Sequence, residues 1–136
     1  MGEREELNLK QISFKQALNG SLNQLTSLAE CSSGAEDPIS VTDCVLVKNS
    51  DARSQIIMYS EEESCIGDIA REVVSVTELI EQASLLSLKI YKGESENIEY
   101  DRETANSSIN NALIKVDTIS KLNDDEVCRL RNEEKV

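Results

Sequence analysis

The chain has 136 residues, 39% of them hydrophobic and 29% charged, and 26 acidic against 14 basic residues give a formal net charge of −12. The length fits one folded domain, and the composition is far from that of a disordered protein. A field this negative repels phosphates and anionic lipids, which argues against direct binding of nucleic acid or a membrane surface. With 3% aromatic residues and one proline, we expect an aliphatic core built from long helices.

The first predicted element is a helix over about residues 3 to 30. Its apolar residues recur at steps of three and four, which is the period of a helix with one buried face. Three acidic residues in the first turn suit the positive end of the helix dipole. The core positions of this helix are Phe14, Leu18, Leu22 and Leu25.

A linker is predicted over about residues 31 to 50, and its sequence allows two interpretations. Pro38 and the serines and glycine before it indicate a break after the first helix. Ile39 to Val47 keeps a two-residue period that fits a short extended piece. Val41 and Val45 also fit the stripe of the helix that follows, so an early start of that helix is the alternative.

The strongest helical signal runs from about residue 51 to residue 92, where apolar residues fall on heptad positions typical of a coiled coil. A helix of this length spans ~60 Å, more than the rest of the chain can cover. We therefore expect part of its apolar face to dock onto a partner, with Val73 in that seam. The positions of this face are Ile66, Ile69, Val73, Val76, Ile80, Ala83, Leu86 and Ile90.

Gly93 is placed to end the long helix, and a C-terminal helix is predicted over about residues 101 to 122, followed by a charged tail to residue 136. Its polar face carries many Asn and Ser, so it needs packing to be stable. Its core positions are Ile109, Leu113, Val116 and Ile119. The sequence thus predicts an all-α fold: a long helical hairpin (residues 1–93) and a C-terminal part (residues 94–136), with an apolar face left for a partner chain.

The residues that carry most enzyme chemistry are missing. The chain has no histidine, no phosphate-binding loop and no nucleophile elbow. We therefore predict a protein that is not an enzyme, with no catalytic residue, cofactor, metal or small-molecule substrate. The cysteines lie far apart and no signal peptide is evident, which predicts unpaired thiols in a reducing compartment. They are Cys31, Cys44, Cys65 and Cys128.

Two stretches of the sequence carry a resemblance to a known family. The first is Gln16-Ala17-Leu18 followed by Leu22 and Leu25, and the second is Glu78-Leu79-Ile80-Glu81-Gln82-Ala83 leading into Leu85-Leu86-Ser87-Leu88. In the order and length of its helices the chain resembles the subunit 22 family of Mediator, the coactivator that links transcription factors to RNA polymerase II. The likeness covers roughly residues 7 to 92, with a weaker fit of the third helix.

The resemblance implies a nuclear structural subunit of the Mediator head module that takes part in the regulation of transcription. Members of the family pair their hairpin with that of Mediator subunit 11 in a four-helix bundle and dock their C-terminal part onto the scaffold subunit 17. The apolar positions of the first two helices would then form a core shared between two chains.

Three alternatives fit the same residues. The chain could be a helical adaptor of another assembly, such as a kinetochore or a tether, in the cytoplasm. It could be a homodimeric coiled-coil regulator. The heptad stripe could also be the core of a self-contained helical bundle with no partner.

Overall fold

The computed structural model describes residues 2–32 and 37–122, and it places them in four α-helices and two short 3-10 segments. The helices are α1 (Gly2–Thr26), α2 (Pro38–Ile56), α3 (Cys65–Tyr91) and α4 (Ile98–Leu122), and the 3-10 segments are η1 (Ser27–Ser32) and η2 (Ile57–Glu61). The described part of the chain is therefore all-α, as the sequence predicted. The predicted charged tail, residues 123–136, lies outside the described residues. The multi-chain bundle stays a prediction.

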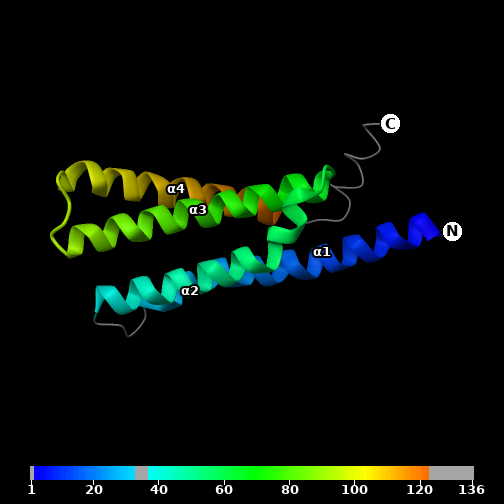
Figure 1. Cartoon of the computed structure of the whole chain (residues 1–136), viewed down its shortest axis with the longest axis horizontal. Helices are drawn as coiled ribbons and strands as arrows, with labels where there is room; N and C mark the ends of the chain where they lie inside the picture. Colours follow the sequence, from blue (N-terminus) through cyan, green and yellow to red (C-terminus); the bar gives the residue numbers. More distant parts are fainter. Residues whose placement is uncertain (1, 33–36, 123–136) are drawn as a thin grey trace.

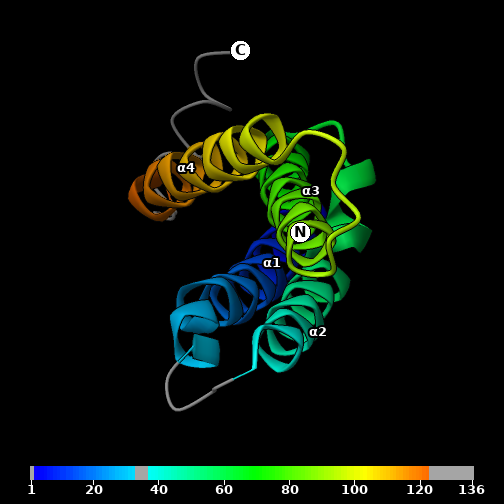
Figure 2. The same cartoon turned by 90° about the vertical axis from the view of Figure 1, so that its left-hand side faces the viewer.

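Consecutive helices run antiparallel and form two pairs, α1 with α2 and α3 with α4 (Figure 1). α3 is central, because it packs along α4 on one side and against α2 on the other. Seen end-on, the four helices follow an arc with α1 at one end and α4 at the other (Figure 2). In the described part of the chain, α1 and α4 are not among the elements that pack extensively against each other. The arc is therefore not closed into a four-helix bundle.

The predicted linker over residues 31–50 is largely helical, which corrects the prediction. α2 begins at Pro38, and Asp37 caps it: its carboxylate accepts a hydrogen bond from the backbone N–H of Ile39 at 3.0 Å. A proline in the first turn of a helix loses nothing, because its missing N–H would have no partner there. Pro38 therefore starts a helix here as well as following the end of α1.

The predicted continuous helix over residues 51–92 is broken, which is the second correction. α2 ends at Ile56, η2 follows, and the chain reverses before Ser64 begins α3. The reversal lets the apolar face of α3 fold back onto α1 and α2, and that burial outweighs the few helical hydrogen bonds lost. Arg71 compensates for part of that loss by donating from Nη1 to the backbone oxygens of Ser60 and Glu62 at 2.7 and 3.0 Å.

Gly67 is required by this reversal. A side chain on Gly67 would collide with the backbone carbonyl of Glu62, which passes directly over the first turn of α3. Only glycine lets two backbone segments approach this closely. A glycine that is unremarkable in a continuous helix thus marks the point where the chain turns back.

The core is aliphatic and lies mainly where α1, α2 and α3 meet. Phe14 packs edge to face on Tyr59 of η2, with ring centroids 5.2 Å apart. Most predicted seam positions are buried inside the chain itself, and Val73 and Val76 are 0% exposed. The expectation that Val73 faces a partner is therefore wrong, because the chain buries Val73 in its own core. The buried seam residues are Phe14, Leu18, Leu22, Leu25, Ile66, Ile69, Val73, Val76, Ala83 and Ile119.

A polar network fixes α2 against α3. The Asn49 side chain, 2% exposed, donates from Nδ2 to the backbone oxygen of Thr77 at 2.8 Å. Arg53 donates to the Thr77 hydroxyl at 2.9 Å and pairs with Glu81 at 2.8 Å. Buried polar groups tolerate few arrangements, so this network sets the register of the two helices.

The turn between α3 and α4 is as predicted. Gly93 has a φ of 73°, the left-handed conformation that ends many helices, and its N–H bonds to the carbonyl of Ile90 at 3.1 Å. α4 then returns along α3, and Lys115 pairs with Glu72 at 3.2 Å. The packing that the polar composition of α4 demands is supplied by α3.

The cysteines contradict the prediction of unpaired thiols. Cys31 in η1 and Cys44 in α2 form a disulfide with their Cα atoms 5.6 Å apart. Cys65 is disulfide-bonded as well, and no described cysteine is a free thiol. Cys128 lies outside the described residues. The prediction was wrong because the antiparallel return of α2 along α1, which brings two distant cysteines together, was not foreseen.

Candidate functional site: an open apolar groove

A groove of about 580 Å³ lies inside the arc of helices. Its lining comes from the end of α1 and from η1 on one side, from the middle of α4 on the other, and from α3 between them; Figure 2 shows how these helices are arranged. The start of α2 completes the wall next to η1. The groove exists because α1 and α4, the two ends of the arc, do not meet.

The lining of the groove is mainly aliphatic. α2, α3 and α4 contribute three or four residues each, α1 and η1 contribute two each, and most of these residues carry Leu, Ile, Val or Ala side chains. The lining consists of Leu25, Thr26, Leu28 and Ala29 from α1 and η1; Val41, Thr42 and Val45 from α2; Ile80, Ala83, Ser84 and Ser87 from α3; and Ile109, Ala112, Leu113 and Val116 from α4.

The four hydroxyls in the lining fall into two groups. Thr42 donates to the carbonyl of Pro38 at 2.8 Å and Thr26 to that of Asn23 at 3.1 Å, so both are satisfied by their own helices. Ser84 and Ser87 lie one turn apart on α3, and neither bonds to another group in the described part of the chain. They are the polar groups that the groove offers to an occupant.

Part of the apolar lining is accessible to solvent. Leu113 is 62% exposed and Ile109 is 42% exposed, although both face the groove. Ala83 and Ala112, deeper in the groove, are 1% and 2% exposed. The groove thus has a packed floor and exposed apolar rims, which is the anatomy of a surface that becomes buried when something binds.

A second hollow, of about 530 Å³, lies between α3 and α4 near the start of α3. Its charged residues neutralise one another: Arg71 pairs with Asp68 at 2.6 Å, and Lys115 pairs with Glu72 at 3.2 Å. No charge there is left to bind a ligand, so the apolar groove is the better candidate.

The described residues include neither a cluster that could hold a metal ion nor a helix that could span a membrane. Across residues 2–32 and 37–122, no three Cys, Asp or Glu side chains are grouped so that they could hold a metal ion. Within the same ranges, none of the helices combines the length and the apolar character needed to cross a bilayer.

No protein-family model, curated protein or solved structure matches the chain. The groove must therefore be interpreted from its own residues.

The residues that the sequence placed at a partner interface separate into three sets. Six of them line the groove: Leu25, Ile80, Ala83, Ile109, Leu113 and Val116. Eight others belong to the internal core: Phe14, Leu18, Leu22, Ile66, Ile69, Val73, Val76 and Ile119. Leu86 and Ile90 are half-buried on α3, outside the groove lining.

The remaining lining residues were missed. Val41 and Val45 were noted but left between a strand and a helix, and Leu28 and Ala112 were not named as interface positions. The signal that could have found the first two is their spacing of four, which places both on one face of a helix. Ser84 and Ser87 gave no signal, because a serine on a long helix is usually solvated.

Proposed function

We propose that the protein is a non-enzymatic binding protein that takes an amphipathic helix of a partner protein into the groove between α1 and α4. The observation that carries the proposal is the open arc: four helices surround an apolar groove where a closed bundle would hold another helix. Docking a helix in an apolar groove is a common mode of recognition, and helices pack at 8–10 Å between axes.

The length of the groove sets the length of the occupant. The lining runs from Ile80 to Ser87 on α3 and from Ile109 to Val116 on α4. Seven helical steps span about 10 Å, or two turns. The partner helix therefore presents apolar residues at positions i, i+3 or i+4, and i+7. A hydrogen-bonding side chain on the same face would reach Ser84 and Ser87.

The charge of the chain sets the flanks of the occupant. With a formal net charge of −12, the protein attracts positively charged segments and repels acidic ones. We therefore expect Lys or Arg on the outer face of the partner helix.

The Mediator head module offers one named candidate, in which the groove would receive a helix of subunit 11 and α4 would reach subunit 17. This candidate rests on the sequence resemblance alone. The Cys31–Cys44 disulfide counts against it, because disulfides are rare in the reducing nucleus. The proposed helix binding does not depend on it.

The proposal is tested with two adjacent residues of α4 that have similar size and exposure, only one of which lines the groove. Leu113 lines the groove and is 62% exposed, whereas Ile114 is 64% exposed and is not part of the lining. Leu113→Glu and Ile114→Glu add the same charge at sites of equal exposure. The probe is a fluorescein-labelled 14-residue amphipathic helix of leucine and lysine, and its binding is measured by fluorescence anisotropy.

Wild type is expected to bind the leucine–lysine helix. Leu113→Glu should weaken this binding by about tenfold or more, because loss of the buried leucine side chain removes at least about 1.4 kcal/mol of binding free energy. Ile114→Glu should change the affinity less than twofold, and a leucine–glutamate helix should not bind. Absence of binding by wild type, or equal loss in both variants, refutes the proposal. Copurification with wild type and with each variant then identifies the cellular partner. Recovery of Mediator subunits 11 and 17 with wild type and Ile114→Glu, but not with Leu113→Glu, would establish the family. Recovery of a dimer of the chain would establish self-association.

A further inference from the structure

The wall of the groove next to α1 is its weakest part. η1, Ser27–Ser32, supplies Leu28 and Ala29 to the lining. A 3-10 helix has poor hydrogen-bond geometry and rarely persists beyond a few residues unless something holds it. The position of Leu28 and Ala29 therefore depends on how η1 is attached to α2.

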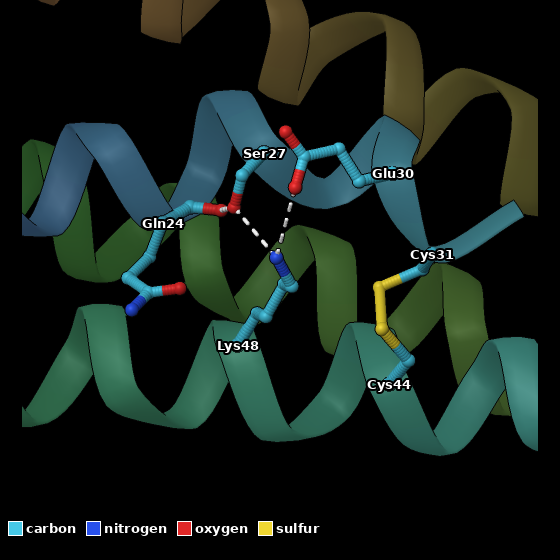
Figure 3. The surroundings of a disulfide bond; sticks show 6 residues. All are labelled: Gln24, Ser27, Glu30, Cys31, Cys44 and Lys48. Carbon is cyan, nitrogen blue, oxygen red and sulfur yellow. Dashed lines mark hydrogen bonds and ion pairs between the residues drawn. A yellow bond between two sulfur atoms is a disulfide. The ribbon is translucent and has the colours of Figure 1, made fainter. Parts of the chain in front are cut away.

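Besides the packing of Leu28 on the core, a polar contact and a covalent bond join η1 to α2 in the described part of the chain, and Figure 3 shows both. The first is polar: the Lys48 ammonium donates to the Ser27 hydroxyl at 3.0 Å and pairs with Glu30 at 3.6 Å. The Glu30 side chain is 77% exposed, and ion pairs this exposed contribute little. The second attachment is the covalent Cys31–Cys44 bond, which is the stronger of the two.

The disulfide is also placed at the groove. Cys31 comes two residues after Ala29, and Cys44 stands between Thr42 and Val45 on α2, so the bond joins two segments of the lining. The large buried core of α1, around Phe14 and Leu18, is several turns away along the helix. Cleavage of the bond therefore loosens this wall of the groove and leaves the packing of the rest of the fold largely unchanged.

We propose that the Cys31–Cys44 disulfide is a redox control of the groove: the oxidised chain holds η1 against α2 and binds a partner helix, and the reduced chain binds it weakly. The reductant is a dithiol, which donates two electrons and two protons. The S–S bond breaks to give two cysteine thiols, and the dithiol becomes its own disulfide. The effect on binding rests on the proposed function of the groove, whereas the release of η1 does not.

The test compares wild type with the double variant Cys31→Ser/Cys44→Ser, using the leucine–lysine helix as the probe. Dithiothreitol also reduces the bond of Cys65, so the variant without reductant isolates the Cys31–Cys44 bond. We expect about fivefold weaker binding or more for reduced wild type and for the untreated variant, with far-UV circular dichroism unchanged. Dithiothreitol should add little to the loss in the variant. Lys48→Met, which removes the polar attachment only, should stay within twofold of wild type.

Hydrogen exchange gives a second readout that needs no ligand. In reduced wild type, and equally in the untreated Cys31→Ser/Cys44→Ser variant, amides of residues 27–32 should exchange at least tenfold faster than in oxidised wild type, while those at the centre of α3 keep their protection. Equal affinity in both redox states, or unchanged exchange in residues 27–32, overturns the inference. Failure of oxidised wild type to bind the probe refutes the proposed function instead, and the exchange result then decides the redox inference alone.

Discussion

Substitution of Gly67 by alanine distinguishes the observed fold from the continuous helix that the sequence suggested, because the two predict opposite signs. In the interior of a continuous helix, Gly→Ala stabilises by about 1 kcal/mol. In the structure, the new methyl group would overlap the backbone carbonyl of Glu62. Neither backbone segment can move without disturbing the packing of α3 on η2, and overpacking of this kind costs about 1–3 kcal/mol.

The expected net effect of Gly67→Ala is a loss of about 2 kcal/mol in the free energy of unfolding, because a collision with backbone carries the upper cost of about 3 kcal/mol and helix propensity returns about 1 kcal/mol. For a chain of this size, that lowers the unfolding midpoint by roughly 6 °C. Urea and thermal unfolding followed by circular dichroism, without reductant, measure both quantities. The variant should remain helical at low temperature.

Gly20→Ala is the matched control. A methyl group there meets only the end of the Gln55 side chain, which is flexible and can swing aside. We expect a gain of about 0.5–1 kcal/mol from helix propensity. A Gly67→Ala variant that gains stability as Gly20→Ala does would show that the chain does not reverse before α3, and the four-helix arc would then be wrong.

Three further substitutions test the core and the surface. Val73→Asp places an unpaired charge at a position that is 0% exposed and should lower the free energy of unfolding by several kcal/mol, enough to unfold the chain. A variant with full helicity by circular dichroism would contradict the burial of Val73. Asn49→Leu gives up a hydrogen bond of about 0.5–1.5 kcal/mol to Thr77 and removes a carbonyl oxygen that has no partner. Urea unfolding should therefore show a change of less than about 1 kcal/mol, and a larger loss would mean that the oxygen is satisfied. Lys115→Met removes the ion pair with Glu72, whose side chains are 36% and 56% exposed, and should change stability by less than about 1 kcal/mol; a larger change would show that this pair holds α4 in place.

The sequence by itself determined the helical character of the chain and most residues of its hydrophobic core. Stripes of Leu, Ile and Val at steps of three and four can be buried only on one face of a helix, so Phe14, Leu18 and Ile119 were found as core positions. The end of α3 at Gly93 was found for a local reason too, because a glycine after an apolar stripe is a frequent helix end.

The tertiary structure alone decided where the long stripe breaks, what covers its buried face, and which cysteines meet. The helical spacing of apolar residues can continue across a break between two helices, so the sequence of residues 57–64 did not reveal that the helix ends there. The meaning of Gly67 depends on Glu62 passing over it. The pairing of Cys31 with Cys44 depends on the antiparallel return of α2. The groove exists because α1 and α4 do not meet. A sequence shows which helix faces are apolar, but it does not show which two faces stay apart in the fold.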